Sequence, residues 1–109
     1  MTNRSIILAL LLACAIATRT LAAQHPATPP YKRDVPGKLL PQAKISEDSA
    51  RARALARVPG STVKALELER EHRHLIWSFD LTVAGKPGIE EVNVDALTGK
   101  VVSVVHENN

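Results

Sequence analysis

The chain has 109 residues, of which 45% are hydrophobic and 23% are charged. This length allows one small domain and leaves no room for a large enzyme core. The aromatic residues are Tyr31, Trp77 and Phe79, too few for the stacking platforms that bind single-stranded nucleic acid. The formal net charge of +3 is unevenly spread, because from Lys44 onward 9 basic residues stand against 10 acidic ones. The composition therefore argues against a nucleic-acid partner.

Residues 1–22 have the composition of a cleavable signal peptide. A short start that carries Arg4 precedes residues 6–17, which are apolar but too few to span a bilayer, for which about 18 are needed. Thr20 and Ala22 are small residues at the positions that suit cleavage after Ala22. The sequence thus predicts export to the periplasm or the medium. The alternative is an N-terminal membrane anchor that is not cleaved.

Cys14 is the only cysteine, so the chain can form no intramolecular disulfide. The tetrapeptide LLAC at residues 11–14 resembles a bacterial lipobox, in which the cysteine is lipidated and tethers the mature protein to a membrane. The residues after Cys14 stay apolar through Ala17, unlike a polar lipoprotein tether, and a second cleavage site follows. We therefore expect Cys14 to be a small apolar residue of the signal peptide.

Residues 23–43 are rich in proline, which removes backbone N–H donors and blocks both helices and central strands. The prolines are Pro26, Pro29, Pro30, Pro36 and Pro41. Such a segment favours extended, polyproline-like conformations, so we predict a flexible linker. The linker would hold the folded domain away from the membrane or the exit site.

The folded domain is predicted to cover residues 44–107 and to begin with a helix. Ser46 can cap the free N–H groups of the first turn, and Pro59 followed by Gly60 ends the helix. Ala50 and Ala54 are four residues apart and give the helix a narrow face of small residues. Such a face suits close packing on a sheet.

After Gly60 the hydrophobic period changes to two, which is typical of strands with one buried face. Val63 and Ala65 are out of phase with the leucines that follow, which indicates a bulge or an early twist. Because short turns join the strands, neighbouring strands are expected to be antiparallel. The predicted strands are residues 66–71, 75–83, 92–95 and 101–105. We predict an α+β fold with one N-terminal helix packed across an antiparallel sheet of three to four strands.

An acidic row is one candidate site outside the predicted core. Glu67, Glu69 and Glu71 alternate along one strand face, and Asp80 would extend the row if the strands pair in register. A calcium ion or a basic partner could use such a row. A plain solvated sheet face explains the same alternation more simply.

His72 and His74 are the candidate metal ligands, because on a strand their two-residue spacing would put both side chains on one face. A closed zinc site needs four ligands, however, and only His106 or an acidic residue could complete it. A solvated hairpin turn is the simpler interpretation. No Ser/His/Asp or Cys/His set, glycine-rich phosphate loop or pair of catalytic carboxylates is recognisable, so we expect neither a catalytic residue nor a cofactor.

The order and spacing of several short motifs resemble the PepSY domain, which occurs in propeptides of secreted bacterial metalloproteases and in many exported proteins. The matching motifs are IS at 45–46, AL at 54–55, VPG at 58–60, LELE at 66–69 and VDALTGKV at 94–101. In VDALTGKV, the most specific of them, Asp95 is expected to bind backbone N–H groups of a turn and Gly99 to adopt a positive φ. The resemblance implies a PepSY-like fold and a small exported protein that is not an enzyme.

In the protease precursors a catalytic domain follows the PepSY domain, whereas this sequence contains no HExxH motif. The resemblance therefore implies action in trans. The module would bind another exported or membrane protein and, as one option, inhibit or regulate a peptidase. The alternative is a periplasmic protein that binds a metal ion or a small ligand through His72, His74 and the acidic row.

Overall fold

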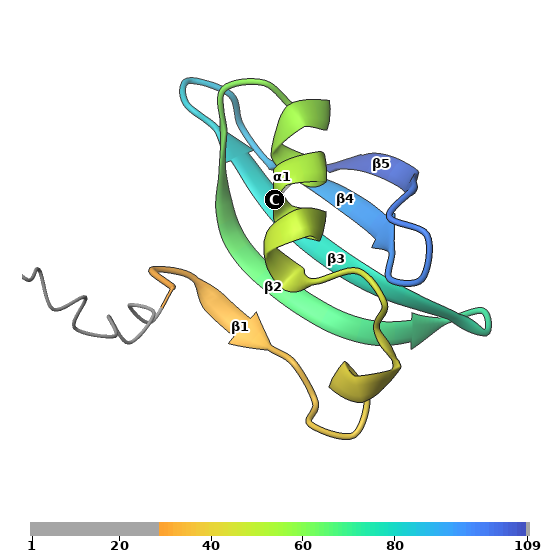
Figure 1. Cartoon of the computed structure of the whole chain (residues 1–109). Coiled ribbons are helices and arrows are strands. Elements are labelled where there is room, and N and C mark those ends of the chain that lie inside the picture. The colour runs from red at the N-terminus through yellow and green to blue at the C-terminus, as the bar shows by residue number, and fades with distance from the viewer. Residues whose placement is uncertain (1–28, 109) are drawn as a thin grey trace, which may run out of the picture.

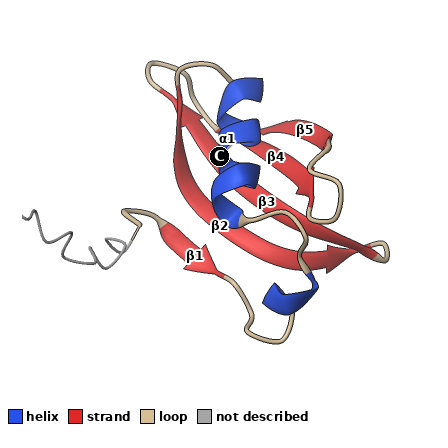
Figure 2. Cartoon of the chain, in the orientation of Figure 1, coloured by secondary structure: helices blue, strands red, loops and turns tan. Residues whose placement is uncertain are grey.

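The computed structural model describes residues 29–108 and places one α-helix against a single twisted sheet (Figure 1). The elements in chain order are β1 (Lys32–Asp34), the 3-10 helix η1 (Leu40–Gln42), α1 (Glu47–Arg57), β2 (Ser61–Glu71), β3 (His74–Val83), β4 (Ile89–Asp95) and β5 (Val101–Glu107). The strands lie in the order β1-β2-β3-β4-β5, in which β2 to β5 form an antiparallel meander and β1 pairs with β2 in parallel. The helix crosses one face of the sheet (Figure 2). The predicted α+β fold is confirmed, with five strands instead of three to four.

The ends of α1 are the ones that the sequence predicts. The Ser46 hydroxyl oxygen accepts a hydrogen bond from the Ser49 N–H at 3.1 Å, and two acidic residues follow in the first turn. At the other end the Val58 N–H donates to the Ala54 carbonyl, just before the Pro-Gly pair. Within residues 29–108, no helix combines the length and the hydropathy that crossing a membrane requires.

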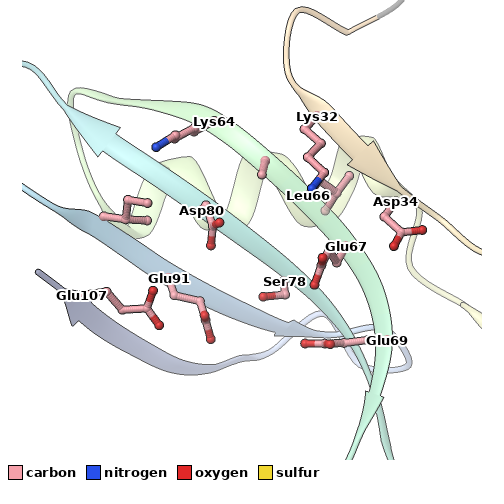
Figure 3. A pocket seen from close by; sticks show the side chains of 12 residues that line it. Lys32, Asp34, Lys64, Leu66, Glu67, Glu69, Ser78, Asp80, Glu91 and Glu107 are labelled. Carbon is pink, nitrogen blue, oxygen red and sulfur yellow. The ribbon is translucent and has the colours of Figure 1, made fainter. Parts of the chain in front are cut away.

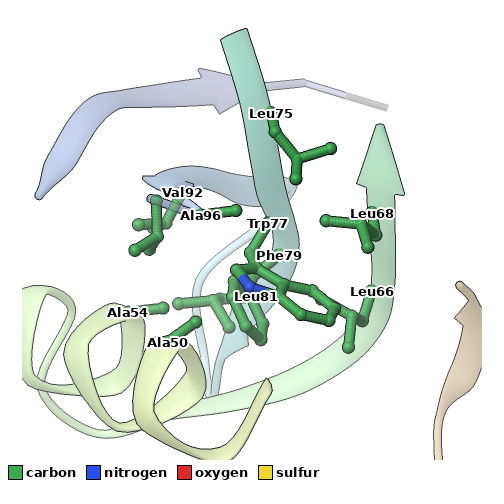
Figure 4. Packing of buried hydrophobic residues seen from close by; sticks show 11 residues of the cluster. Ala50, Ala54, Leu66, Leu68, Leu75, Trp77, Phe79, Leu81, Val92 and Ala96 are labelled. Atoms are coloured by element: carbon green, nitrogen blue, oxygen red, sulfur yellow. The ribbon is translucent and has the colours of Figure 1, made fainter. Parts of the chain in front are cut away.

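The hydrophobic core lies between α1 and the sheet face that α1 covers (Figure 4). Ala50 and Ala54 of α1 are fully buried, and their small side chains let the helix approach the sheet closely. Trp77 at the centre of β3 is also fully buried, and its indole N–H donates to the Ile45 carbonyl at 2.9 Å. The strands contribute Leu66, Leu68, Leu75, Phe79, Leu81, Val92 and Val94 to the same core. The alternation of the sequence therefore predicted the core face correctly.

β2 bends around α1 as it passes along the sheet (Figure 1). Its pairing with β3 shifts register between Val63 and Ala65, which confirms the irregularity that the phase change predicts. A bulge bends a strand and increases its local twist. Beyond the shift, Leu66 is buried in the core while Glu67 is exposed on the opposite face.

Residues 30–43 carry structure that their prolines did not predict. β1 pairs with β2, and η1 forms a short helical turn. Arg51 of α1 donates a hydrogen bond to the Tyr31 hydroxyl at 2.8 Å, and the Arg33 side chain lies 2.7 Å from the Glu47 carboxylate. These contacts hold the segment against the domain, so residues 30–43 are not the extended spacer that the sequence suggests. The predicted signal peptide with Cys14 lies outside the described residues, and the domain boundaries stay predictions.

The turn between β4 and β5 is built as the VDALTGKV motif predicts. The carboxylate of Asp95 accepts hydrogen bonds from the N–H groups of Leu97 and Thr98, at 2.7 and 3.0 Å. Gly99 has a φ of +77°, a conformation that side chains resist. Arg53 of α1 donates to the Gly99 carbonyl at 3.1 Å and ties the helix to the turn. Asp95 thus has a structural role in this turn.

Candidate functional site

The sheet face that α1 leaves uncovered, called the outer face below, carries a groove of about 350 Å³ (Figure 3). All five strands contribute side chains to its lining. Six carboxylates and two lysine side chains border the groove: Asp34, Glu67, Glu69, Asp80, Glu91 and Glu107, with Lys32 and Lys64. With both types of group ionised, the groove carries a net negative charge.

Strand register brings these carboxylates together from distant parts of the sequence. Asp80 lies opposite Glu91 in the pairing of β3 with β4, and Glu91 lies opposite Val105 in the pairing of β4 with β5. The predicted acidic row on β2 and its extension to Asp80 are therefore present. Asp34, Glu91 and Glu107 also border the groove, and the sequence pattern did not identify them as part of the row. The alternation around Glu91 places it on the outer face, but nothing in the sequence specifies which side chains lie beside it.

The middle of the outer face is buried although no helix within residues 29–108 covers it. Ile76, Ser78 and Asn93 are only 4, 7 and 6% exposed. The longer side chains of neighbouring strands surround them, for example the carboxylates that share the groove with Ser78. The plain solvated face predicted from the alternation is therefore wrong for these three residues, whereas Glu67 on the same face is exposed and Asp80 and Glu91 are partly exposed.

Three carboxylates of the groove have raised pKa values, so their surroundings disfavour the ionised form. Burial raises the pKa of Glu69, and the neighbouring glutamates of β2 raise it further. Burial also raises the pKa of Asp80, reinforced by Glu107 and opposed by Lys64. The pKa of Glu91 is raised by burial and by Glu107, against a hydrogen bond that lowers it. In each case burial is the largest cause. Loss of hydration therefore raises these pKa values more than repulsion by neighbouring carboxylates does.

Asn93 has an unsatisfied acceptor in the buried part of the outer face. Its side-chain N–H donates to a carboxylate oxygen of Glu91 at 3.2 Å. Its Oδ1 atom is buried and has no hydrogen-bond partner among the described residues. Leaving a buried polar atom unpaired costs about 1–3 kcal/mol. Asn93 is therefore a buried amide with one unpaired oxygen atom beside Glu91, a carboxylate whose pKa burial raises.

The two candidate metal ligands lie at the rim of a second depression, of about 260 Å³, beside Asn93 on the outer face. His72 is in the turn between β2 and β3 with a φ of +46°, and its side chain is 90% exposed. His74 begins β3, so the two histidines do not share a strand. Within residues 29–108, no group of three or more His, Cys, Asp or Glu side chains is placed to hold a metal ion. His72 therefore lies in an exposed hairpin turn, and the expectation that the two histidines hold no metal ion stays a prediction.

The raised pKa values predict that the free energy of unfolding falls as the pH rises from about 4 to 7. Asp80 is ionised more easily in the unfolded chain than in the folded one, so its stabilising contribution is complete below its unfolded pKa. That contribution is lost as the pH rises through the folded pKa. The protonated ring of His106 donates hydrogen bonds to the Glu90 carboxylate and to the Asn108 side-chain oxygen, which raises the pKa of His106 and acts in the same direction near neutral pH.

Urea denaturation at several pH values measures this dependence. We expect Asp80→Asn to raise the urea midpoint at pH 7 and to flatten the pH profile, because the substitution removes one ionisable group that the groove hydrates poorly. A midpoint that increases from pH 5 to pH 7 in the wild type would contradict the prediction.

The geometry defines a small α+β domain with one sheet face under a helix and the other open and acidic. The sequence matches the PepSY family, described as peptidase propeptide and YPEB domain, over residues 44–105, which is more than half of the chain. The chain therefore belongs to the PepSY family, as its motifs suggested. Domains of this family are generally non-catalytic propeptide or regulatory modules. No curated protein and no solved structure matches the chain.

Proposed function

We propose that this chain is an exported, non-catalytic module that binds another exported or membrane protein through its outer face. Membership of the PepSY family supports a regulatory role without chemistry of its own. The predicted signal peptide supports a periplasmic or secreted location. Regulation of a peptidase in trans is the more specific form of the proposal, since propeptides of peptidases belong to the same family.

Binding at the outer face is supported by the burial and the charge environment of its carboxylates. Glu69, Asp80 and Glu91 are partly buried and have raised pKa values, and few positive groups lie among them. An opposite charge within about 4–6 Å favours the ionised form of a carboxylate. A basic surface on a partner would therefore supply the positive charge that the groove lacks, and complementary charge also speeds association.

A pair of charge-matched variants tests this proposal. Glu69→Gln with Glu91→Gln removes two negative charges from the groove, whereas Ala52→Lys with Ala56→Lys adds two positive charges at exposed positions of α1. A photo-crosslinker at Ser103, on the outer face of β5, identifies the partner in the periplasmic fraction. We expect the glutamine pair to weaken binding of the purified partner about ten-fold or more and the lysine pair to leave it unchanged.

Three outcomes would change the proposal. Equal effects of the two variants would contradict binding through the outer face. A partner whose peptide hydrolysis is unaffected by the module would remove peptidase regulation and leave partner binding. A rise of the melting temperature with Ca²⁺ or Zn²⁺ that the glutamine pair abolishes would favour a metal-binding protein instead.

A further inference from the structure

The sheet has an open apolar edge at β5. β5 is the last strand of the order β1-β2-β3-β4-β5, and within residues 29–108 no strand pairs with its other side. Its first five residues, VVSVV, include neither a charged side chain nor a proline. Val102, Val104 and Val105 are 49, 38 and 48% exposed. An exposed apolar strand of this kind is a template for pairing with another strand.

β1, the strand at the opposite edge of the sheet, is protected against pairing with a further strand, and this part of β5 is not. β1 is three residues long, and all of them are charged. Arg33 of β1 is held by the carboxylate of Glu47, and Pro36 follows shortly after the strand. Natural sheets block their edges with short strands, charges and prolines. Of the two edges, β5 is therefore the one that can receive a further strand.

The two sides of β5 differ in the side chains that an added strand would meet. Val105 and Glu107 lie on the outer face, where Glu91 of β4 stands opposite Val105. Val104 lies on the α1 side, opposite the buried Val92. In an added strand, side chains that point to the outer face would lie beside Val105 and Glu107 of β5 and one strand away from Glu91, a distance that a long basic side chain can span. Alternate side chains would lie beside Val104. This environment fits a strand in which basic and apolar residues alternate.

Charge argues against a second copy of this chain as the occupant of the edge. Antiparallel pairing of two β5 strands keeps both outer faces on the same side of one continuous sheet. Two grooves, each bordered by six carboxylates and two lysine side chains, would then lie side by side. Like charges brought together in this way oppose association.

We propose that β5 binds an extended segment of the partner as an additional antiparallel strand, with basic side chains on the outer face and apolar side chains on the α1 side. The inference rests on the proposed function, since it names the part of the partner that the module recognises. Backbone hydrogen bonds to the free side of β5 supply affinity, and the alternation of side chains supplies specificity.

Synthetic peptides of 7 residues, the length of β5, test the recognition directly on the mature chain. One peptide alternates lysine with valine and the other alternates glutamate with valine. Hydrogen exchange should slow in residues 101–107 with the lysine peptide, and the glutamate peptide should bind at least about ten-fold more weakly. Equal protection by both peptides, or protection that avoids β5, would overturn the proposal.

Proline substitutions separate edge pairing from folding. Successive N–H groups of a strand point to opposite sides, so one of Val104→Pro and Val105→Pro removes an N–H bonded to β4 and the other removes an N–H on the free side. The variant that keeps the wild-type melting temperature reports on the edge, and we expect it to bind the lysine peptide at least about ten-fold more weakly. Unchanged peptide binding by that variant would contradict strand addition.

The same variants distinguish the two proposals when the purified partner is used. If Glu69→Gln with Glu91→Gln abolishes partner binding and the stable proline variant does not, the edge inference fails and the outer-face function stands. If neither variant matters, both fail. Sedimentation of the wild type as a dimer that the proline variant dissociates would make a second copy the occupant and would also overturn the inference.

Discussion

Trp77→Ala should leave the domain largely unfolded at physiological temperature. Trp77 is fully buried at the centre of β3, and its side chain faces the alanines of α1. Truncating a buried Phe or Trp to alanine costs about 3–5 kcal/mol. Native proteins are stable by about 5–15 kcal/mol, and a domain this small belongs at the low end of that range. Thermal melting and urea denaturation of the variant beside the wild type measure the loss.

Two companion variants show where the loss comes from. Trp77→Phe keeps an aromatic ring but leaves the Ile45 carbonyl without its indole donor, and should cost about 1 kcal/mol for the hydrogen bond alone. Ile76→Thr tests the other face. The period-two alternation places Ile76 on the face opposite the core and predicts little effect. Because Ile76 is only 4% exposed, we expect the free energy of unfolding to fall by about 1–2 kcal/mol. A larger loss for Ile76→Thr than for Trp77→Ala would contradict the assignment of the main core to the α1 side.

Gly88→Ala should destabilise the domain more than Gly85→Ala, although the two glycines have nearly the same conformation. Their φ values are +80° and +78°, so an alanine at either position pays about 1–2 kcal/mol for a left-handed backbone. A Cβ at Gly85 meets nothing, whereas a Cβ at Gly88 overlaps the backbone carbonyl oxygen of Glu107. Either the turn or the end of β5 must therefore move in Gly88→Ala.

If the end of β5 moves in Gly88→Ala, the change should be measurable locally in β5, beyond any loss of global stability. His106 of β5 lies 2.6 Å from the Glu90 carboxylate, and moving the end of β5 would break this contact. Hydrogen exchange in residues 101–107 should therefore accelerate more in Gly88→Ala than in Gly85→Ala at equal denaturant. Equal melting temperatures for the two variants would contradict the prediction, because they would show that β5 can move without a loss of stability.

Local signals along the chain predicted most of the secondary structure. The cap at Ser46 and the Pro-Gly stop bound α1 because they act on backbone groups within one turn. The alternation in β3 identifies Trp77 and Phe79 as core residues because successive side chains of a strand point to opposite faces. Gly99 and Asp95 specify the last turn for the same local reason.

The N-terminal segment shows where local reasoning fails. Its prolines and charges are typical of a spacer, yet β1 pairs with residues more than thirty positions later in the chain, in β2. Contacts with α1 hold it there: Arg51 with Tyr31, and Arg33 with Glu47. Each contact joins residues at least 14 positions apart, so no pattern within the segment reveals it.

The sequence by itself determined the helix, the four strands of the meander, the core face and the PepSY resemblance, because each depends on local geometry or on short motifs. It also placed Glu67 and Glu69 on the face opposite the core. Only the tertiary structure decided that Asp34, Glu91 and Glu107 join them and Asp80 around one groove, and that the open edge lies beside it. The physical reason is that alternation assigns a residue to a face, whereas strand order, register and the bulges at Val63/Ala65 and Asn93/Val94 determine its neighbours on that face.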